Sequence, residues 1–238
     1  MNNYKKLESG RSMIEMLGVL AIIGVLSVGG IAGYSKAMNK FKTNKVADQV
    51  SMLVANIKTM YAQQNTYDGL SNETAISLGV VPDELVVKTK DTSNNEKTEL
   101  LNSFNGPVFI FASDSTSGGD KKAFTIEFNN LSKEACITLA TNDWGSGYSS
   151  GLIALRAAGK SATAATEKLK TVYIGDEGTP GREEVKADKD KNVTGNDNDV
   201  IATPGGQAGA RVPLSVTSAA VACGCSAGNT CSLQWKYY

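Results

Sequence analysis

The sequence contains no histidine among its 238 residues. The chain therefore has no Ser-His-Asp or Cys-His nucleophile, no HExxH zinc site and no histidine proton shuttle. Its 24 basic residues balance 24 acidic residues, so no basic surplus is present to displace counterions from nucleic-acid phosphates. We also find no set of acid, base and nucleophile that converges on a substrate. The sequence therefore predicts no enzyme, no cofactor and no nucleic-acid partner.

Charged residues are missing from one continuous and mostly apolar stretch, residues 16–35. As a helix, these 20 residues are about 30 Å long, which is the thickness of the hydrocarbon core of a bilayer. A secretory signal peptide is the alternative. This apolar core is too long for one, however, and no small-x-small cleavage site leads into a separate mature domain. The stretch predicts a membrane-spanning helix.

The helical pattern continues beyond this span. Apolar residues recur at steps of mostly three and four, which is the stripe of an amphipathic helix, at Phe41, Val46, Val50, Leu53, Val54, Ile57, Met60 and Tyr61. Polar residues between them predict a solvated opposite face, formed by Lys42, Lys45, Asp48, Gln49, Asn56 and Lys58. We predict one helix over about residues 13–64, apolar on all sides in its first half and on one side in its second.

The orientation of the span follows from two observations that disagree. Lysine and arginine are slightly more frequent after the span (Lys36, Lys40, Lys42 and Lys45) than before it (Lys5, Lys6 and Arg11), which favours a cytoplasmic body. All four cysteines also lie after the span, and an even number there indicates an oxidising compartment. We give the cysteines more weight and predict a body outside the cytoplasm.

The cysteines are Cys136, Cys223, Cys225 and Cys231. Zinc binding is the competing interpretation. The Cys223-x-Cys225 spacing is too short for the usual zinc knuckle, and without histidine the fourth ligand would be the distant Cys136. Disulfide bonds are the better account, and four cysteines allow three pairings between which the residues alone do not choose.

Glu15 lies at the edge of the apolar stretch, where a carboxylate is unfavourable, and less so near the interface than at the bilayer centre. One explanation is a glutamate exposed to lipid headgroups. Another requires a cationic partner. If the chain is cut after Gly10, a new α-amino group appears on Arg11, four residues before Glu15.

This arrangement resembles type IV pilins and type II secretion pseudopilins: a short basic leader ending in glycine, glutamate as the fifth residue after it, and then an unbroken apolar helix. The resemblance implies that a prepilin peptidase cuts between Gly10 and Arg11 and methylates the new amino terminus. It also implies that Glu15 neutralises the terminal amine of a neighbouring subunit in the filament. Arg11 departs from the family, which usually has an apolar residue there, and places a second cation beside the amine.

The remainder, residues 65–238, predicts an α+β head. We expect helices at about residues 72–78, 133–139 (capped by Ser132) and 215–223, and strands at 108–112, 123–128, 168–174 and 231–238. Residues 152–155 are expected to form a short buried piece, and Phe124, Ile126 and Phe128 to alternate between the inside and the outside. Residues 91–97 and 113–122 read as polar loops, and about 175–211 as a longer polar surface loop.

Two segments, NSFNGPVFIF and KAFTIEFNNLSKEACITLAT, resemble the type IVb pilins. The absence of proline from the membrane helix fits that branch, whereas the ten-residue leader is shorter than type IVb leaders usually are. This resemblance implies a Cys136–Cys223 disulfide, so that Cys225 and Cys231 close a small loop.

The acidic stretch at residues 188–199 partly matches a calcium-binding loop, with candidate ligands Asp188, Asp190, Asn192 and Asp199. Val193 occupies the position of the sharp-turn glycine. A solvated polar loop is the better interpretation, although some pseudopilins bind calcium near their C-terminus.

Together these observations predict a pilin fold in which a long N-terminal helix packs on a C-terminal antiparallel sheet. The expected divisions are a leader (1–10), a transmembrane and filament-core half-helix (11–36), an amphipathic half-helix (37–64) and the head (65–238).

The resemblance implies a homo-oligomeric helical filament, with a prepilin peptidase, the inner-membrane pilus assembly machinery and membrane lipid as partners. The subunit would lie in the inner membrane, head in the periplasm, before it joins the extracellular pilus. A minor pilin or pseudopilin, and an uncleaved membrane-anchored periplasmic binding domain, are the alternatives.

Overall fold

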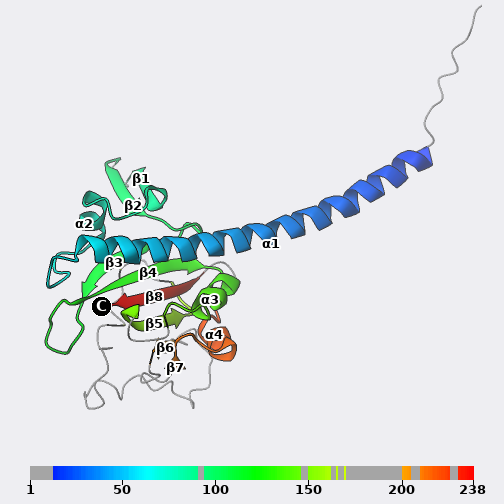
Figure 1. Cartoon of the computed structure of the whole chain (residues 1–238). Helices are drawn as coiled ribbons and strands as arrows, with labels where there is room; N and C mark the ends of the chain where they lie inside the picture. Colours follow the sequence, from blue (N-terminus) through cyan, green and yellow to red (C-terminus); the bar gives the residue numbers. More distant parts are fainter. Residues whose placement is uncertain are drawn as a thin grey trace, which may run out of the picture. The chain divides into compact units, whose positions relative to one another are not determined.

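The computed structural model describes residues 13–90, 94–145, 150–161, 165, 169, 200–204, 210–225 and 230–238. The chain divides into two compact units, Met1–Phe41 and Lys42–Tyr238, which are described separately below. The division falls inside the first helix, α1 (Met13–Met60), a few residues beyond the predicted boundary between residues 36 and 37. Figure 1 shows the elements in chain order.

The predicted long helix is present as α1, with 48 residues. It ends four residues before the predicted end, because residues 61–63 form a turn closed by Gln64 N–H donating to the carbonyl of Tyr61 (2.9 Å). In the first unit the helix stands by itself. Its apolar side chains between Met13 and Tyr34 are exposed on every side.

The second unit is built on a six-stranded sheet in the order β3-β4-β8-β5-β6-β7 (Figure 1). The strands are β3 (Val108–Ser113), β4 (Ala123–Leu131), β5 (Leu152–Ala158), β6 (Val200–Thr203), β7 (Ala210–Arg211) and β8 (Cys231–Tyr237). Neighbouring strands are antiparallel except β6 and β7, which are parallel. The last strand of the chain therefore lies in the middle of the sheet, between β4 and β5.

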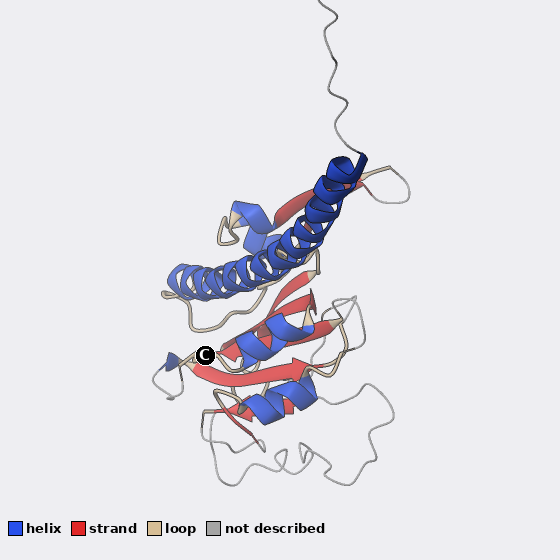
Figure 2. Cartoon of the chain, turned by 90° about the vertical axis from the view of Figure 1, so that its right-hand side faces the viewer, coloured by secondary structure: helices blue, strands red, loops and turns tan. Residues whose placement is uncertain are grey.

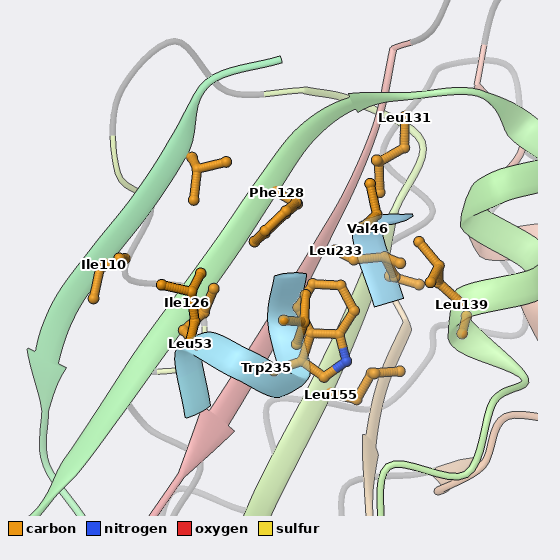
Figure 3. Packing of buried hydrophobic residues seen from close by; sticks show 14 of the residues in the cluster. Val46, Leu53, Ile110, Ile126, Phe128, Leu131, Leu139, Leu155, Leu233 and Trp235 are labelled. Atoms are coloured by element: carbon orange, nitrogen blue, oxygen red, sulfur yellow. The ribbon is translucent and has the colours of Figure 1, made fainter. Parts of the chain in front are cut away.

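The second part of α1 packs on one face of this sheet. Val46, Val50, Leu53 and Ile57, at helical spacing, are fully buried. Figure 3 shows Val46 and Leu53 close to the aromatic and aliphatic side chains of β4, β5 and β8 that share the same core: Ile126, Phe128, Leu155, Leu233 and Trp235. Burial of a leucine or isoleucine stabilises the fold by about 1.5–3 kcal/mol, so this stripe fixes α1 on the sheet.

The opposite face of the central strands is polar, yet it is also buried. Glu127, Gln234 and Lys236 have no exposed surface, and Arg156 is 6% exposed. The predicted alternation of apolar Phe124, Ile126 and Phe128 with other residues is present along β4. The expectation that one set of these residues faces outward is wrong, because both sets are buried. All residues of β4 except Asn130 are buried, because the sheet is covered on both faces.

A serine side chain caps the N-terminus of each of α2, α3 and α4, and Figure 2 shows α3 and α4 in blue against the sheet. Ser71 Oγ accepts from Thr74 N–H at the start of α2 (Asn72–Ser77), and Ser132 Oγ accepts from Ala135 N–H at the start of α3 (Lys133–Ala140). Ser215 Oγ does the same for Ser218 N–H at the start of α4 (Val216–Ala222). These caps satisfy N–H groups that have no partner inside a helix, and all three predicted helices are confirmed.

A separate two-stranded antiparallel sheet, β1 (Val86–Lys90) and β2 (Glu96–Leu100), follows the single-turn 3-10 helix η1 (Asp83–Leu85). The sequence did not predict it. Glu96 and Lys97 belong to β2, so the polar loop predicted for residues 91–97 is wrong at that end. Both strands are largely exposed and charged, which removes the apolar alternation that identifies a strand.

The long polar loop predicted for residues 175–211 is also wrong where it is described, because β6 and β7 lie within it. β6 pairs with β5, and β7 pairs with β6, so both strands form through backbone pairing rather than through a strong apolar pattern of their own. The strand predicted for residues 168–174 lies outside the described residues, apart from the buried Leu169.

The turn before β3 is held by Asn102. Its Oδ1 accepts from Phe104 N–H (2.8 Å) and Gly106 N–H (3.1 Å), and its Nδ2 donates to the carbonyl of Asn129 (2.7 Å). A Cβ atom on Gly106 would lie 1.8 Å from that same carbonyl oxygen, so only glycine allows this close approach of two backbones.

Candidate assembly site

Between Met16 and Tyr34 the exposed surface of α1 is apolar in all directions. Val25, Leu26 and Val28 are 76%, 69% and 71% exposed. An 18-residue window of α1 has a mean hydropathy of 2.2, and α1 is the one described helix long and apolar enough to cross a membrane. Such a surface is stable in lipid or against other apolar helices and unfavourable in water.

Glu15 lies in the first turn of α1 and is exposed. A carboxylate in this position interacts favourably with the unpaired N–H groups at the start of the helix. Between Glu15 and Lys36 the helix carries no charge. Gly10 and Arg11, where cleavage is predicted, lie outside the described residues.

Near its entry into the head, α1 is held by polar contacts to Glu84. Lys45 Nζ lies 3.0 Å from Glu84 Oε2, and Gln49 Nε2 donates to Glu84 Oε1 (2.8 Å). The hydrogen bonds from Gln49 and then Lys45 lower the pKa of the Glu84 carboxyl group. Gln49 is 2% exposed, so its place on the predicted solvated face is wrong. It lies beside the apolar stripe, on the side of the helix that packs on the head.

Near its end, α1 is held by Lys58. The ammonium group donates to the carbonyl of Ser150 (3.2 Å) and lies 5.1 Å from the centre of the Tyr237 ring. Burial lowers the pKa of Lys58 and raises the pKa of Tyr237. Lys58 is half-buried, so it too leaves the predicted solvated face. Helical periodicity missed it because a long side chain reaches beyond the arc that its Cα position defines.

Two disulfide bonds lie side by side in the head. They join Cys136 of α3 to Cys223 at the end of α4, and Cys225 to Cys231 at the start of β8. This is the pairing that the type IVb resemblance implies. The first bond closes a sequence separation of 87 residues and the second one of 6. In the chain-entropy treatment these loops contribute about 4–5 and about 2 kcal/mol of stability.

The same cysteines are the one group of possible metal ligands found among the described residues. The sulfur atoms of Cys136, Cys223 and Cys231 lie within 4.8 Å of one another. All four cysteines are bonded in pairs, so these sulfurs are not thiolate ligands. The calcium candidates Asp188, Asp190, Asn192 and Asp199 lie outside the described residues.

Lys236 is a buried charge that the sequence analysis did not find. Its side chain has no exposed surface, and Nζ donates to the carbonyl of Leu169 (2.8 Å). Burial lowers its pKa to about 8, although the carboxylates of Asp114 and Asp120 act in the opposite direction. The signal in the sequence is the alternation LQWKY in β8, which places Lys236 opposite the Trp235 face. That alternation normally marks a solvated face.

Residues 40–203 match the family described as PilS N terminal. The chain belongs to the PilS pilin family. Its pilin resemblance and α+β pilin fold are thereby confirmed, and this family is a family of structural proteins.

Two similar proteins are pilus subunits of bacteria. The chain is 29% identical over 142 residues to the major structural subunit of bundle-forming pilus of Escherichia coli O127:H6. The aligned residues make up 59% of this chain and 68% of the relative. It is 27% identical over 141 residues to the toxin coregulated pilin of Vibrio cholerae, covering 59% and 60%.

Solved structures with some likeness to this pilin are also type IV pilins. A type IV b pilin from Salmonella typhi has 17% identity and a TM-score of 0.42, with 78% of this chain and 93% of that chain covered. TcpA from Vibrio cholerae El Tor biotype has 18% identity and a TM-score of 0.45, with 83% and 99% covered.

Proposed function

We propose that the chain is the structural subunit of a type IVb pilus-like filament. The observation that carries this proposal is the first half of α1, in which residues 16–35 expose apolar side chains on all sides and are preceded by the charged Glu15. A surface of this kind requires a non-aqueous environment at every stage. The inner membrane supplies it before assembly, and the same helices of other subunits supply it in the filament core.

Glu15 gives assembly its direction and register. Cleavage between Gly10 and Arg11 by a prepilin peptidase creates a positive amino terminus, which the peptidase then methylates. A buried carboxylate is strongly unfavourable alone, and pairing with a cation on the neighbouring subunit compensates for this. An incoming helix that is displaced along its axis loses this pair, so the charge selects one position among many apolar contacts of similar energy.

The glycines of the first half of α1 favour close contact between helices. They are Gly18, Gly24, Gly29, Gly30 and Gly33, and each has open space where a side chain would stand. Small residues let helix backbones approach closely, and van der Waals packing then replaces contact with lipid. Assembly therefore exchanges one apolar environment for another at little cost in free energy.

The head belongs in an oxidising compartment. Its two disulfides form and persist in the periplasm and at the cell surface, whereas the cytoplasm keeps thiols reduced. The subunit accordingly spans the inner membrane once with its head in the periplasm. It meets the peptidase and the pilus assembly machinery there, and leaves the cell as part of the filament.

The test is the mass and the N-terminal sequence of the chain recovered from sheared surface filaments of a cell that has a pilus assembly system. We expect an abundant chain that begins at methylated Arg11, and we expect a Gly10→Val variant to remain uncleaved and cell-bound. A chain that begins at Met1 and yields no filaments contradicts the proposal and identifies a permanent membrane anchor. A cleaved chain present at only a few copies per filament identifies a minor pilin or pseudopilin instead.

A further inference from the structure

We propose that Lys36 and Lys40, together with Tyr34, bind anionic lipid headgroups and fix the depth of the subunit in the bilayer before assembly. This inference rests on the proposed function in one respect, because it requires the apolar half of α1 to lie in a membrane. The partner is the phosphate-bearing surface of the leaflet that faces the head.

The charge along α1 is strongly one-sided after the apolar stretch. Between Glu15 and Asp48 the helix carries four lysines and no acidic residue. Lys36 and Lys40 are four residues apart and therefore lie on one side of the helix. Like charges at this spacing destabilise a helix, so the pair is unfavourable for the helix itself.

The four lysines differ in whether the protein supplies them with a partner. Lys42 lies 5.7 Å from the centre of the Phe104 ring, and Lys45 pairs with Glu84; both side chains are half-buried. Lys36 and Lys40 are exposed, and neither forms an ion pair with any described residue. Within the second unit Lys42 and Lys45 thus have partners, whereas Lys36 and Lys40 of the first unit are exposed.

The positions of the lysines along the helix match the layers of a bilayer. The uncharged stretch of residues 16–35 spans the hydrocarbon core of about 30 Å, and the headgroup layer adds roughly 5–8 Å on each side. At about 1.5 Å per residue, Lys36 lies at the start of that layer and Lys40 about 6 Å further, still inside it. Lys42 and Lys45 lie about 9 and 14 Å beyond the core, outside the headgroups. The unpaired lysines are therefore the two at headgroup depth.

Tyr34 and Ser35, just before Lys36, have side chains that are favourable at the boundary between hydrocarbon and headgroups. Tyr34 is 66% exposed at the end of the apolar stretch, where an amphipathic aromatic ring sits between hydrocarbon and headgroups. Ser35 Oγ donates to the carbonyl of Ile31 (3.0 Å), so the hydroxyl group is satisfied within the helix as it enters the interface. The flexible lysine side chains extend from there towards phosphate oxygens.

The experiment compares lipid binding by the full-length chain and its variants after reconstitution into vesicles of phosphatidylcholine with one quarter phosphatidylglycerol. Spin-labelled phosphatidylglycerol and phosphatidylcholine report how strongly each lipid associates with the protein. The test variant is Lys36→Gln/Lys40→Gln. The matched control is Lys88→Gln/Lys90→Gln, which removes the same charge from two exposed lysines of β1.

We expect the wild-type chain to prefer phosphatidylglycerol, and the test variant to lose at least about half of that preference, because each lysine near an anionic surface contributes to binding. The control variant should retain it, and high salt should reduce the wild-type preference to the level of the test variant. An unchanged preference in the test variant overturns the proposal. If that variant also fails to form filaments, the two lysines face acidic groups of another subunit instead.

A separate measurement keeps this inference distinct from the proposed function. All variants should remain in the vesicles during extraction with alkaline carbonate, because the apolar half of α1 is unchanged. If the wild-type chain is itself extracted, the membrane-spanning role fails. If it is retained without any preference for the anionic lipid, only the headgroup-binding inference fails.

Discussion

The two parts of α1 differ in what surrounds their apolar side chains. In residues 42–60 the apolar side chains form a stripe, and Val46, Val50, Leu53 and Ile57 are fully buried in the head. Between Met13 and Tyr34 they cover the whole circumference and are exposed. The second part of the helix thus has its partner within the folded head. Under the proposed function, lipid or other subunits are the partner of the first part, so the stability of the head and the assembly of the filament depend on different segments of one helix.

The largest effect on the head should come from its long-range disulfide. Cys136→Ser/Cys223→Ser removes a bond with a sequence separation of 87 residues and should lower the free energy of unfolding by about 4–5 kcal/mol. Cys225→Ser/Cys231→Ser opens the short loop and should lower it by about 2 kcal/mol. Denaturant unfolding in detergent, followed by the fluorescence of Trp144 and Trp235, measures both. Equal losses would show that loop length does not determine the contribution.

A leucine in each part of α1 sharpens the comparison. Leu53→Ala leaves a cavity between the helix and the sheet and should destabilise the head by about 2–5 kcal/mol. Leu26→Ala, at a 69% exposed position, should change the stability of the head by less than about 0.5 kcal/mol. Thermal unfolding of the two variants in the same detergent checks this. A comparable loss from Leu26→Ala would mean that the first part of α1 also packs on the head.

A further expected effect depends on pH and belongs to the head alone. Burial lowers the pKa of Lys236 from 10.5 to about 8, so between these values the unfolded chain binds more protons than the folded chain. The free energy of unfolding should therefore rise by about 2 kcal/mol between about pH 8 and pH 10. Above about pH 10 the raised pKa of Tyr237 acts in the opposite direction.

Lys236→Met should flatten this rise, and Lys88→Met, at an exposed position in β1, should leave it unchanged. Denaturant midpoints measured at intervals across the window test both variants. If the free energy of unfolding still rises across this window in Lys236→Met, a titratable group other than Lys236 causes the rise.

Elements with strong local signals were predictable from the sequence. α3 follows Ser132 as its N-cap, and β3 and β4 contain continuous or alternating apolar runs, so local chemistry and tertiary packing agree there. β1 and β2 lack such runs because they are charged and exposed. β6 and β7 are short: β6 depends on pairing with β5, and β7 on pairing with β6, which is information that lies elsewhere in the chain.

Part of the candidate site was predictable from the sequence, as was part of the fold. Glu15 and the apolar helix are visible because their chemistry depends on local sequence alone. Gln49, Lys58 and Lys236 were not recognised, because whether a polar side chain is solvated depends on what packs above it in three dimensions. The residues alone also left three disulfide pairings open, since pairing depends on how α3, α4 and β8 meet.

The most direct test of the central claim is the filament yield of Glu15→Gln, which keeps the shape of the side chain and removes its charge. If Glu15 pairs with the amino terminus of the neighbouring subunit, the cleaved and membrane-held pilin should accumulate while sheared filaments fall at least about tenfold, as the loss of about 1.4 kcal/mol per subunit contact requires. Filaments in normal yield from this variant would contradict the account.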